Sequence, residues 1–192
     1  MIAGVDYGSK TAGTTVLARV INGEIVLSQS LKGQNADSFI SEIVAGEDIR
    51  LIALDAPLSL PGKLVSVPGK DNYFYRDCDS QLKAMSPMFI GGLTARAIKL
   101  KDEFIEQGRE VIEAYPKAFV VNLTYDEFYS KKNLSNLQEF IDKLNEEFSD
   151  FRFPEVKNWH QTDAIIALLI AHKYQKGTHS SAGDPDEGLI IY

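Results

Sequence analysis

Residues 1–18, MIAGVDYGSKTAGTTVLA, decide the fold class. They begin with a short apolar run that ends on Asp6, pass through the turn-forming stretch GSKTAG, and return in a second β-rich run. A third run follows Asn22-Gly23, a dipeptide that favours a two-residue hairpin turn. The pattern predicts an antiparallel three-stranded meander over residues 2–7, 14–20 and 24–30.

The rest of the chain alternates helical patterns with apolar strands. After Asn35, apolar side chains recur at helical spacing as far as Gly46, and residues 51–54 then read as a strand that is buried on both faces. A helix between two strands implies a right-handed crossover to a parallel neighbour. Similar patterns predict helices at 94–107, 134–148 and 163–174, and strands at 109–115 and 189–192. We therefore expect one α/β domain over residues 1–192, with a mixed sheet of the meander plus parallel strands, flanked by helices.

Residues 56–92 lose this periodicity and contain several prolines and glycines, which predicts a long irregular insertion, a feature that is usually functional or partly mobile. Between residues 63 and 101 the chain has seven basic side chains and three acidic ones, a local net charge of +4. Tyr73, Phe74 and Tyr75 are interleaved with these charges. Such a composition can hold phosphates and stack an unpaired base, although an aromatic anchor in a solvated loop is an equal alternative.

The bulk composition narrows the function classes. The net charge of the 192-residue chain is −7, so the whole surface does not favour long duplex nucleic acid or an anionic membrane. A single cysteine excludes a disulfide framework and fits a reducing cytoplasm. No long apolar run or basic leader is present, so we expect a cytoplasmic protein without a membrane segment.

Four acidic residues lie where buried elements meet loops. Asp6, Asp55 and Glu113 each end an apolar strand, and Asp163 opens the most apolar helix. A buried carboxylate must be neutralised, hydrogen-bonded or bound to a cation, and oxygen-only clusters suit Mg²⁺ or Mn²⁺. We therefore expect these four side chains to converge as metal ligands. Each has an alternative role: Asp6 and Asp55 could close turns, and Asp163 could be a first-turn residue favoured by the helix dipole. Glu113 could pair with Lys117 or Arg96.

His160 precedes Asp163 by three residues, so both would face the same side of a helix that begins early enough. This spacing makes His160 a candidate ligand or proton donor, although packing beside Trp159 is the alternative. The sequence has no phosphate loop of the Walker type, no GxSxG and no HExxH, which leaves serine and zinc hydrolase chemistry without support.

Several motifs together resemble a known family. The GVDYGSKTAGTTV start and the WHQTDAIIALLIAH helix are similar to the first strand and last helix of RuvC-type resolvases in the RNase H-like superfamily. The order of LIALDAPLSLP, YRDCDSQL, VIEAYP and TDAIIALLIAH resembles the family of predicted RNase H-like nucleases known as domain of unknown function 429, over nearly the full chain.

The resemblance implies an RNase H-like fold and an acidic site of Asp6, Asp55, Glu113 and Asp163, with Arg76 and Asp79 nearby. We expect a divalent-metal-dependent nuclease that acts on single-stranded or structured nucleic acid, DNA or RNA. Its substrate phosphates would be held by Arg76, Lys63 and Lys70. Two alternatives remain open: an ATP-binding phosphotransferase related to actin-like kinases, and a non-catalytic RNase H-like binding module.

Overall fold

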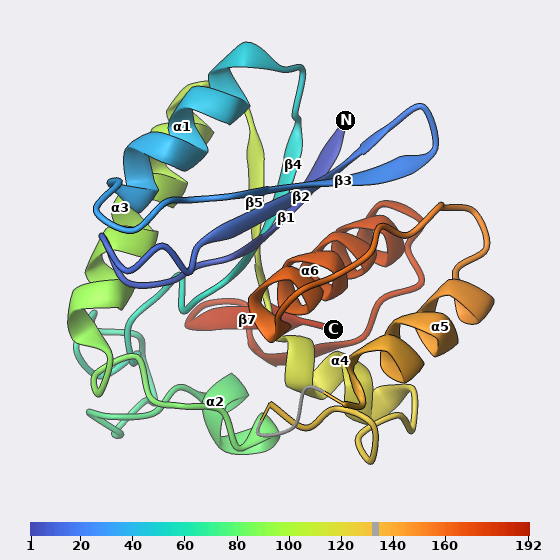
Figure 1. Cartoon of the computed structure of the whole chain (residues 1–192). Helices are drawn as coiled ribbons and strands as arrows, with labels where there is room; N and C mark the ends of the chain where they lie inside the picture. The colour runs from blue at the N-terminus through green and yellow to red at the C-terminus, as the bar shows by residue number, and fades with distance from the viewer. Residues whose placement is uncertain (132–134) are drawn as a thin grey trace.

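The computed structural model describes residues 1–131 and 135–192. Seven strands form one sheet in the order β3-β2-β1-β4-β5-β7-β6 (Figure 1). Its parallel part consists of β1 (Ile2–Asp6), β4 (Leu51–Asp55), β5 (Glu110–Ala114) and β7 (Gly188–Ile191). The antiparallel strands are β2 (Val16–Ile21), β3 (Glu24–Gln29) and β6 (Ser181–Asp184). The predicted mixed α/β sheet is confirmed.

The meander of β1, β2 and β3 forms as expected. Asn22 and Gly23 have φ angles of 52° and 80°, the left-handed values that a two-residue hairpin turn of type I′ requires. Asn tolerates this conformation and Gly has no side chain that opposes it. The two-residue turn pairs Ile21 with Glu24 and so fixes the register of β2 against β3. The hairpin of β2 and β3 therefore follows from local turn chemistry.

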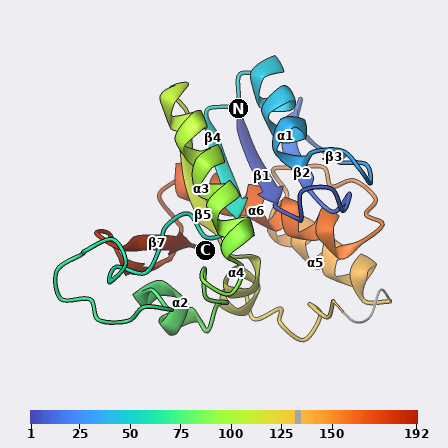
Figure 2. The ribbon, with the colours of Figure 1, turned by 90° about the vertical axis from the view of Figure 1, so that its left-hand side faces the viewer.

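Helices cover both faces of the sheet (Figures 1 and 2). On one face α1 (Ala36–Gly46) and α3 (Gly91–Glu106) pack over alternate residues such as Val5 and Leu54. On the other face α6 (Trp159–Gln175) packs over residues such as Ala53 and Ile112, with α4 (Pro116–Asn122) and α5 (Leu137–Glu147) completing the layer. The period-2 alternation of the strands thus separates two apolar layers.

Gly4 in the middle of β1 allows α6 to touch the sheet. A Cβ atom at this position would lie 2.0 Å from the backbone nitrogen of Leu168 and 2.5 Å from the carbonyl oxygen of Ala164. A side chain of any size would therefore push the helix away from the strand. The missing side chain at Gly4 sets how closely α6 approaches the end of β1.

Some element boundaries differ from the sequence prediction. α6 begins at Trp159, four residues earlier than expected, because the side chain of Asn158 caps it by accepting a hydrogen bond from the Gln161 amide. The start of the predicted helix 134–148 lies outside the described residues, and α5 begins at Leu137. The strand β6 and two short helices, α4 and α2 (Asp77–Leu82), were not predicted. Each is under eight residues long, too short for a periodic signal.

In the described part of the chain, no helix is both long and apolar enough to cross a membrane.

Candidate metal centre

Two of the predicted acidic residues are direct neighbours in the sheet. β1 and β4 run parallel, and their register pairs Asp6 with Asp55 at the carboxyl ends of both strands. Residues paired in this way point to the same face, here the face covered by α6. The register therefore brings two carboxylates together at the edge where ligands bind in open α/β sheets.

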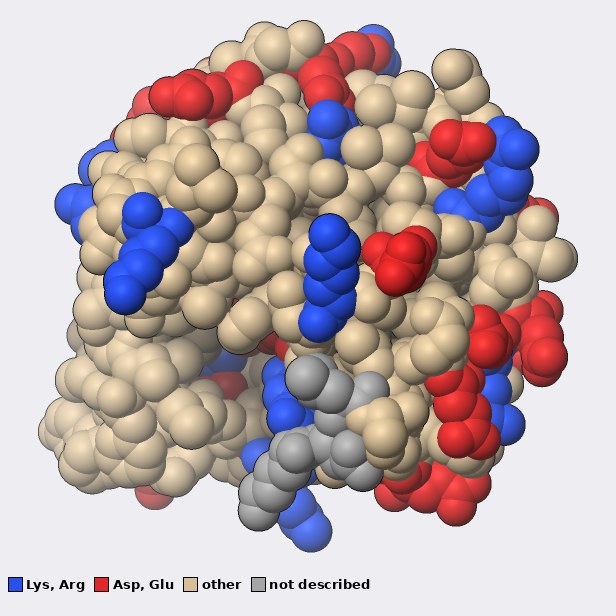
Figure 3. Space-filling model, viewed as in Figure 1, with Lys and Arg blue, Asp and Glu red and all other residues tan. Residues whose placement is uncertain are grey.

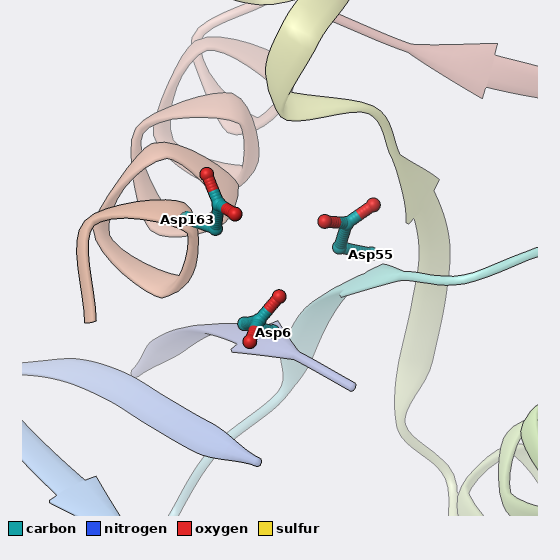
Figure 4. A group of neighbouring side chains, drawn as sticks. All are labelled: Asp6, Asp55 and Asp163. Atoms are coloured by element: carbon teal, nitrogen blue, oxygen red, sulfur yellow. The ribbon is translucent and has the colours of Figure 1, made fainter. Parts of the chain in front are cut away.

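Asp163 joins them from the first turns of α6. One carboxylate oxygen from each of Asp6, Asp55 and Asp163 lies within 4.8 Å of the other two. Figure 4 shows the three side chains pointing toward a common centre from two strand ends and one helix. The close contact of α6 with Gly4 makes this arrangement possible, because Asp163 lies in the same helix, one residue before Ala164.

The three carboxylates are costly to keep charged together. Burial, together with the charges of Asp6 and Asp163, raises the pKa of Asp55 well above its usual range. Burial also raises the pKa of Asp163 to about 6, although the neighbouring Lys131 opposes the shift. Both shifts show that negative charge accumulates here and that a cation would relieve it.

Two residues that sequence reasoning missed contact Asp163. The Lys131 ammonium lies 2.5 Å from Oδ2 of Asp163, and the Tyr129 hydroxyl donates to Oδ1. Both precede the segment 132–134 and are far from Asp163 in sequence, so no local pattern signals the contact. Lys131 supplies one positive charge to the cluster while its own side chain remains 55% exposed.

His160 lies where its spacing predicted, on the same side of α6 as Asp163. Its Nδ1 is 2.8 Å from Oδ2 of Asp6, and this hydrogen bond raises the pKa of the imidazole. The His160 side chain is 47% exposed, compared with 13% for Asp6. His160 therefore sits at the solvent side of the cluster and holds one oxygen of Asp6 in position.

Glu113 does not join the three aspartates. The register of β4 against β5 pairs Glu113 with Leu54 rather than with Asp55, so its side chain points to the opposite face of the sheet. There both of its oxygens accept hydrogen bonds from Arg76, at 2.6 and 2.7 Å. We expected Glu113 to be a metal ligand because it lies at a strand end. It is paired one residue before Asp55, so its side chain points away from the three aspartates.

Arg76 is paired with the carboxylates of Asp79 and Glu113. Its side chain is fully buried, and its guanidinium also donates to both oxygens of Asp79 and to the hydroxyl of Ser59. The cluster of Arg76, Asp79 and Glu113 ties the insertion to β5. A buried arginine with these partners is a structural anchor, and its predicted phosphate contact stays a prediction.

The two predicted lysines differ in availability. The Lys70 ammonium lies 2.6 Å from Asp77 and 2.7 Å from Asp184, so carboxylates already neutralise it. Lys63 is exposed and lies over the ring of Tyr73, with its nitrogen 5.9 Å from the ring centroid. Of the three predicted phosphate-binding residues, Lys63 alone remains open to a ligand.

A cavity of about 200 Å³ opens beside the three aspartates. Its lining includes Asp6 and Asp55, the cluster of Arg76, Asp79 and Glu113, and the apolar side chains of Met85, Ile90 and Leu93. Figure 3 shows a hollow on this face, with acidic and basic atoms inside it and a lobe of mostly uncharged surface on one side. The acidic cluster is therefore reachable by a ligand through a partly apolar pocket.

The donor set fits a divalent cation. Oxygen atoms bound to one Mg²⁺ ion at about 2.1 Å lie about 3–4 Å apart, so carboxylates within 4.8 Å of one another need only small side-chain movements. Three aspartates without cysteine or paired histidines favour Mg²⁺ or Mn²⁺ over zinc. The buried acidic group of Asp6, Asp55 and Asp163 can therefore bind a metal ion.

No protein family model matches this chain, and searches of curated proteins and of solved structures likewise gave no match.

Proposed function

We propose that the chain is an RNase H-like, divalent-metal-dependent hydrolase of phosphodiester bonds in nucleic acid. The observation that carries the proposal is the convergence of Asp6, Asp55 and Asp163 within 4.8 Å at the carboxyl edge of a mixed sheet. The strand order supports the RNase H-like part, because an antiparallel meander continues into parallel strands through β1. The sequence motifs that contain these three aspartates are also the ones that resemble the RNase H-like family, which further supports the proposal.

In this proposal Asp6, Asp55 and Asp163 hold the metal. When bound, Mg²⁺ or Mn²⁺ would activate a water molecule and stabilise charge on the leaving oxygen. The chain itself supplies orientation: His160 fixes one oxygen of Asp6, and Tyr129 fixes one oxygen of Asp163. His160 also presents an exposed imidazole at the mouth of the site, where it can hold a proton for the leaving group.

The test is the substitution Asp6→Asn, which keeps the shape of the side chain and removes its charge. We expect wild-type protein to cleave members of a panel of single-stranded, branched and duplex DNA and RNA with Mn²⁺. The variant should lose at least about 100-fold in rate, because a ligand of the metal is lost. Calorimetric titration with Mn²⁺ should show the matching loss of affinity.

A matched control is Asp48→Asn. Asp48 is an exposed aspartate whose backbone oxygen contacts the amino terminus, at the opposite end of the strands. This control should cleave at the wild-type rate. Equal cleavage by Asp6→Asn and Asp48→Asn would overturn the proposal. Mn²⁺ binding that depends on Asp6 without cleavage of any substrate would support the non-catalytic alternative.

A further inference from the structure

Exposed aromatic and apolar side chains gather on the insertion. Phe74 is 55% exposed, Phe89 is 64% exposed and Met85 is 62% exposed, all within one stretch of the chain. The ring centroids of Phe74 and Phe89 are 6.2 Å apart, and the ring of Tyr75 meets that of Phe89 edge-on at 5.8 Å. We refer to Phe74, Phe89 and Met85 as the aromatic platform.

Hydrogen bonds to Asn72 and Ser86 hold the aromatic platform in place. The side-chain oxygen of Asn72 accepts hydrogen bonds from the amides of Phe74 and Tyr75, at 2.8 and 3.0 Å. The buried Ser86 hydroxyl donates to the carbonyl oxygen of Phe74 and so joins the two loops that form the platform. The exposed rings are therefore presented by an ordered turn, which lowers the entropy lost when a ligand binds.

The platform is continuous with the acidic site. Met85 belongs to the platform and also lines the cavity that reaches Asp6 and Asp55. Ile90, next to Phe89 in the chain, lines the same cavity. A flexible ligand seated on the rings can therefore extend through this cavity to the proposed metal ligands.

Two lysines near this cavity, Lys83 and Lys117, have no carboxylate partner among the described residues. A groove of about 440 Å³ is lined by Lys83 and Lys117. Ala84 and Tyr115, one and two residues away from these lysines in the chain, line the cavity that reaches Asp6 and Asp55. Within residues 1–131 and 135–192, no carboxylate forms an ion pair with either ammonium or with Lys63. In a chain of net charge −7, these cations match an anionic ligand locally.

We propose that the aromatic platform binds unpaired nucleobases of a single-stranded nucleic acid, whose backbone phosphates contact Lys83 and Lys117. Aromatic rings accept any base by stacking, and nearby lysines hold phosphates without reading sequence. Bases inside a duplex are already stacked on one another, so the platform selects an unpaired strand. The inference names the substrate of the proposed hydrolase and rests in that respect on the proposed function.

The experiment measures binding without cleavage. A labelled 15-nucleotide strand of mixed sequence, as DNA and as RNA, is titrated in EDTA and followed by fluorescence anisotropy, with the matching duplex in parallel. The single strand should bind more tightly than the duplex. The double variant Phe74→Ala and Phe89→Ala should weaken single-strand binding about 5-fold to 100-fold. Lys83→Gln with Lys117→Gln should weaken it and flatten its dependence on salt.

The matched control is Ile105→Ala, which removes an apolar side chain that is 51% exposed on α3. It should bind both ligands as the wild type does. Equal single-strand affinity in the control and the platform variant overturns the inference, as does a preference for duplex. A dimer in sedimentation that the platform variant dissociates would also overturn it, because a second copy would then occupy the rings.

The two proposals can fail separately. Binding that depends on the platform, without cleavage by any metal-loaded wild-type sample, retains this inference and rejects the hydrolase. Cleavage that depends on Asp6 but is the same in the platform variant retains the hydrolase and rejects this inference.

Discussion

Lys131 provides a positive charge where the proposed metal would bind. Its ammonium is 2.5 Å from Oδ2 of Asp163, and it also attracts Asp55 and Asp6 electrostatically. A metal ion and an ammonium group compete for the same carboxylate charge. Lys131 is therefore a counter-ion of the metal-free cluster.

Removal of this competitor should strengthen metal binding. We expect Lys131→Met to bind Mn²⁺ about 10-fold more tightly by calorimetry, since a nearby like charge is lost from a partly exposed site. Lys32→Met, a change at an exposed loop residue, should leave the affinity unchanged. Weaker binding in Lys131→Met would mean that the ammonium supports the site instead of competing with the ion.

The sequence alone predicted correctly that three of the four acidic residues, Asp6, Asp55 and Asp163, lie close together. Asp6, Asp55 and Asp163 share a detectable property, an acid at the junction of a buried element and a loop. Glu113 shares the same property, yet a strand register that no local pattern reveals directs it to the other face. Lys131 and Tyr129 reach the cluster through tertiary contacts alone, so their contribution could not be read from spacing.

At the scale of elements, the site depends on how closely α6 lies against β1. Gly4 sets that distance, because the helix backbone occupies the space of its missing side chain. Asp163 is carried by the same helix, so a displaced helix would also displace a metal ligand. Stability and metal affinity are therefore coupled through one glycine.

Gly4→Ala should expose this coupling. The added Cβ would overlap the backbone of Leu168 at 2.0 Å, so we expect a loss of at least about 3 kcal/mol in the free energy of unfolding, measured with urea. Mn²⁺ affinity should fall as well. The matched control is Gly46→Ala, where a Cβ meets nothing within 4 Å. A Gly4→Ala variant as stable as this control would show that α6 is not held against β1.

The elements themselves were predictable where a periodic pattern or turn signal was long enough. The meander follows from the Asn22-Gly23 turn, and α6 follows from a continuous apolar run. The helix start at Trp159 required the Asn158 cap, and the short helix α4 begins at Pro116 with too few turns to show periodicity. Strand order beyond β4 depends on long crossovers, which residue spacing does not encode.

At the scale of the whole molecule, one charged network joins the two helices on the α1 and α3 face. Asp37 at the start of α1 accepts hydrogen bonds from Arg96 of α3, at 2.6 and 3.1 Å, and from the hydroxyl of Tyr7 after β1. Burial alone would raise the pKa of Asp37, but the hydrogen bonds from Arg96 and Tyr7 outweigh it and lower the pKa. The folded state therefore favours the charged carboxylate.

This shift predicts a pH-dependent stability. A folded pKa below the unfolded value means that Asp37 stabilises the fold fully above about pH 4 and loses that contribution as the pH falls through the folded pKa. We expect Asp37→Asn to lower the unfolding free energy by about 1 kcal/mol at pH 7. The difference from wild type should shrink toward pH 3 in urea denaturation. A difference that stays constant from pH 7 to pH 3 would contradict the assignment.

The one-residue offset between β4 and β5 divides the acids at this edge of the sheet into two groups with different sources of positive charge. Glu113 and Asp79 are neutralised permanently by Arg76, a cation that the chain carries within itself. In the group of Asp6, Asp55 and Asp163, the partly exposed Lys131 pairs with Asp163, and the three carboxylates could bind a cation from solution. The contacts that anchor the insertion to β5 therefore need no divalent ion, so the proposed substrate surface would keep its shape with or without a metal.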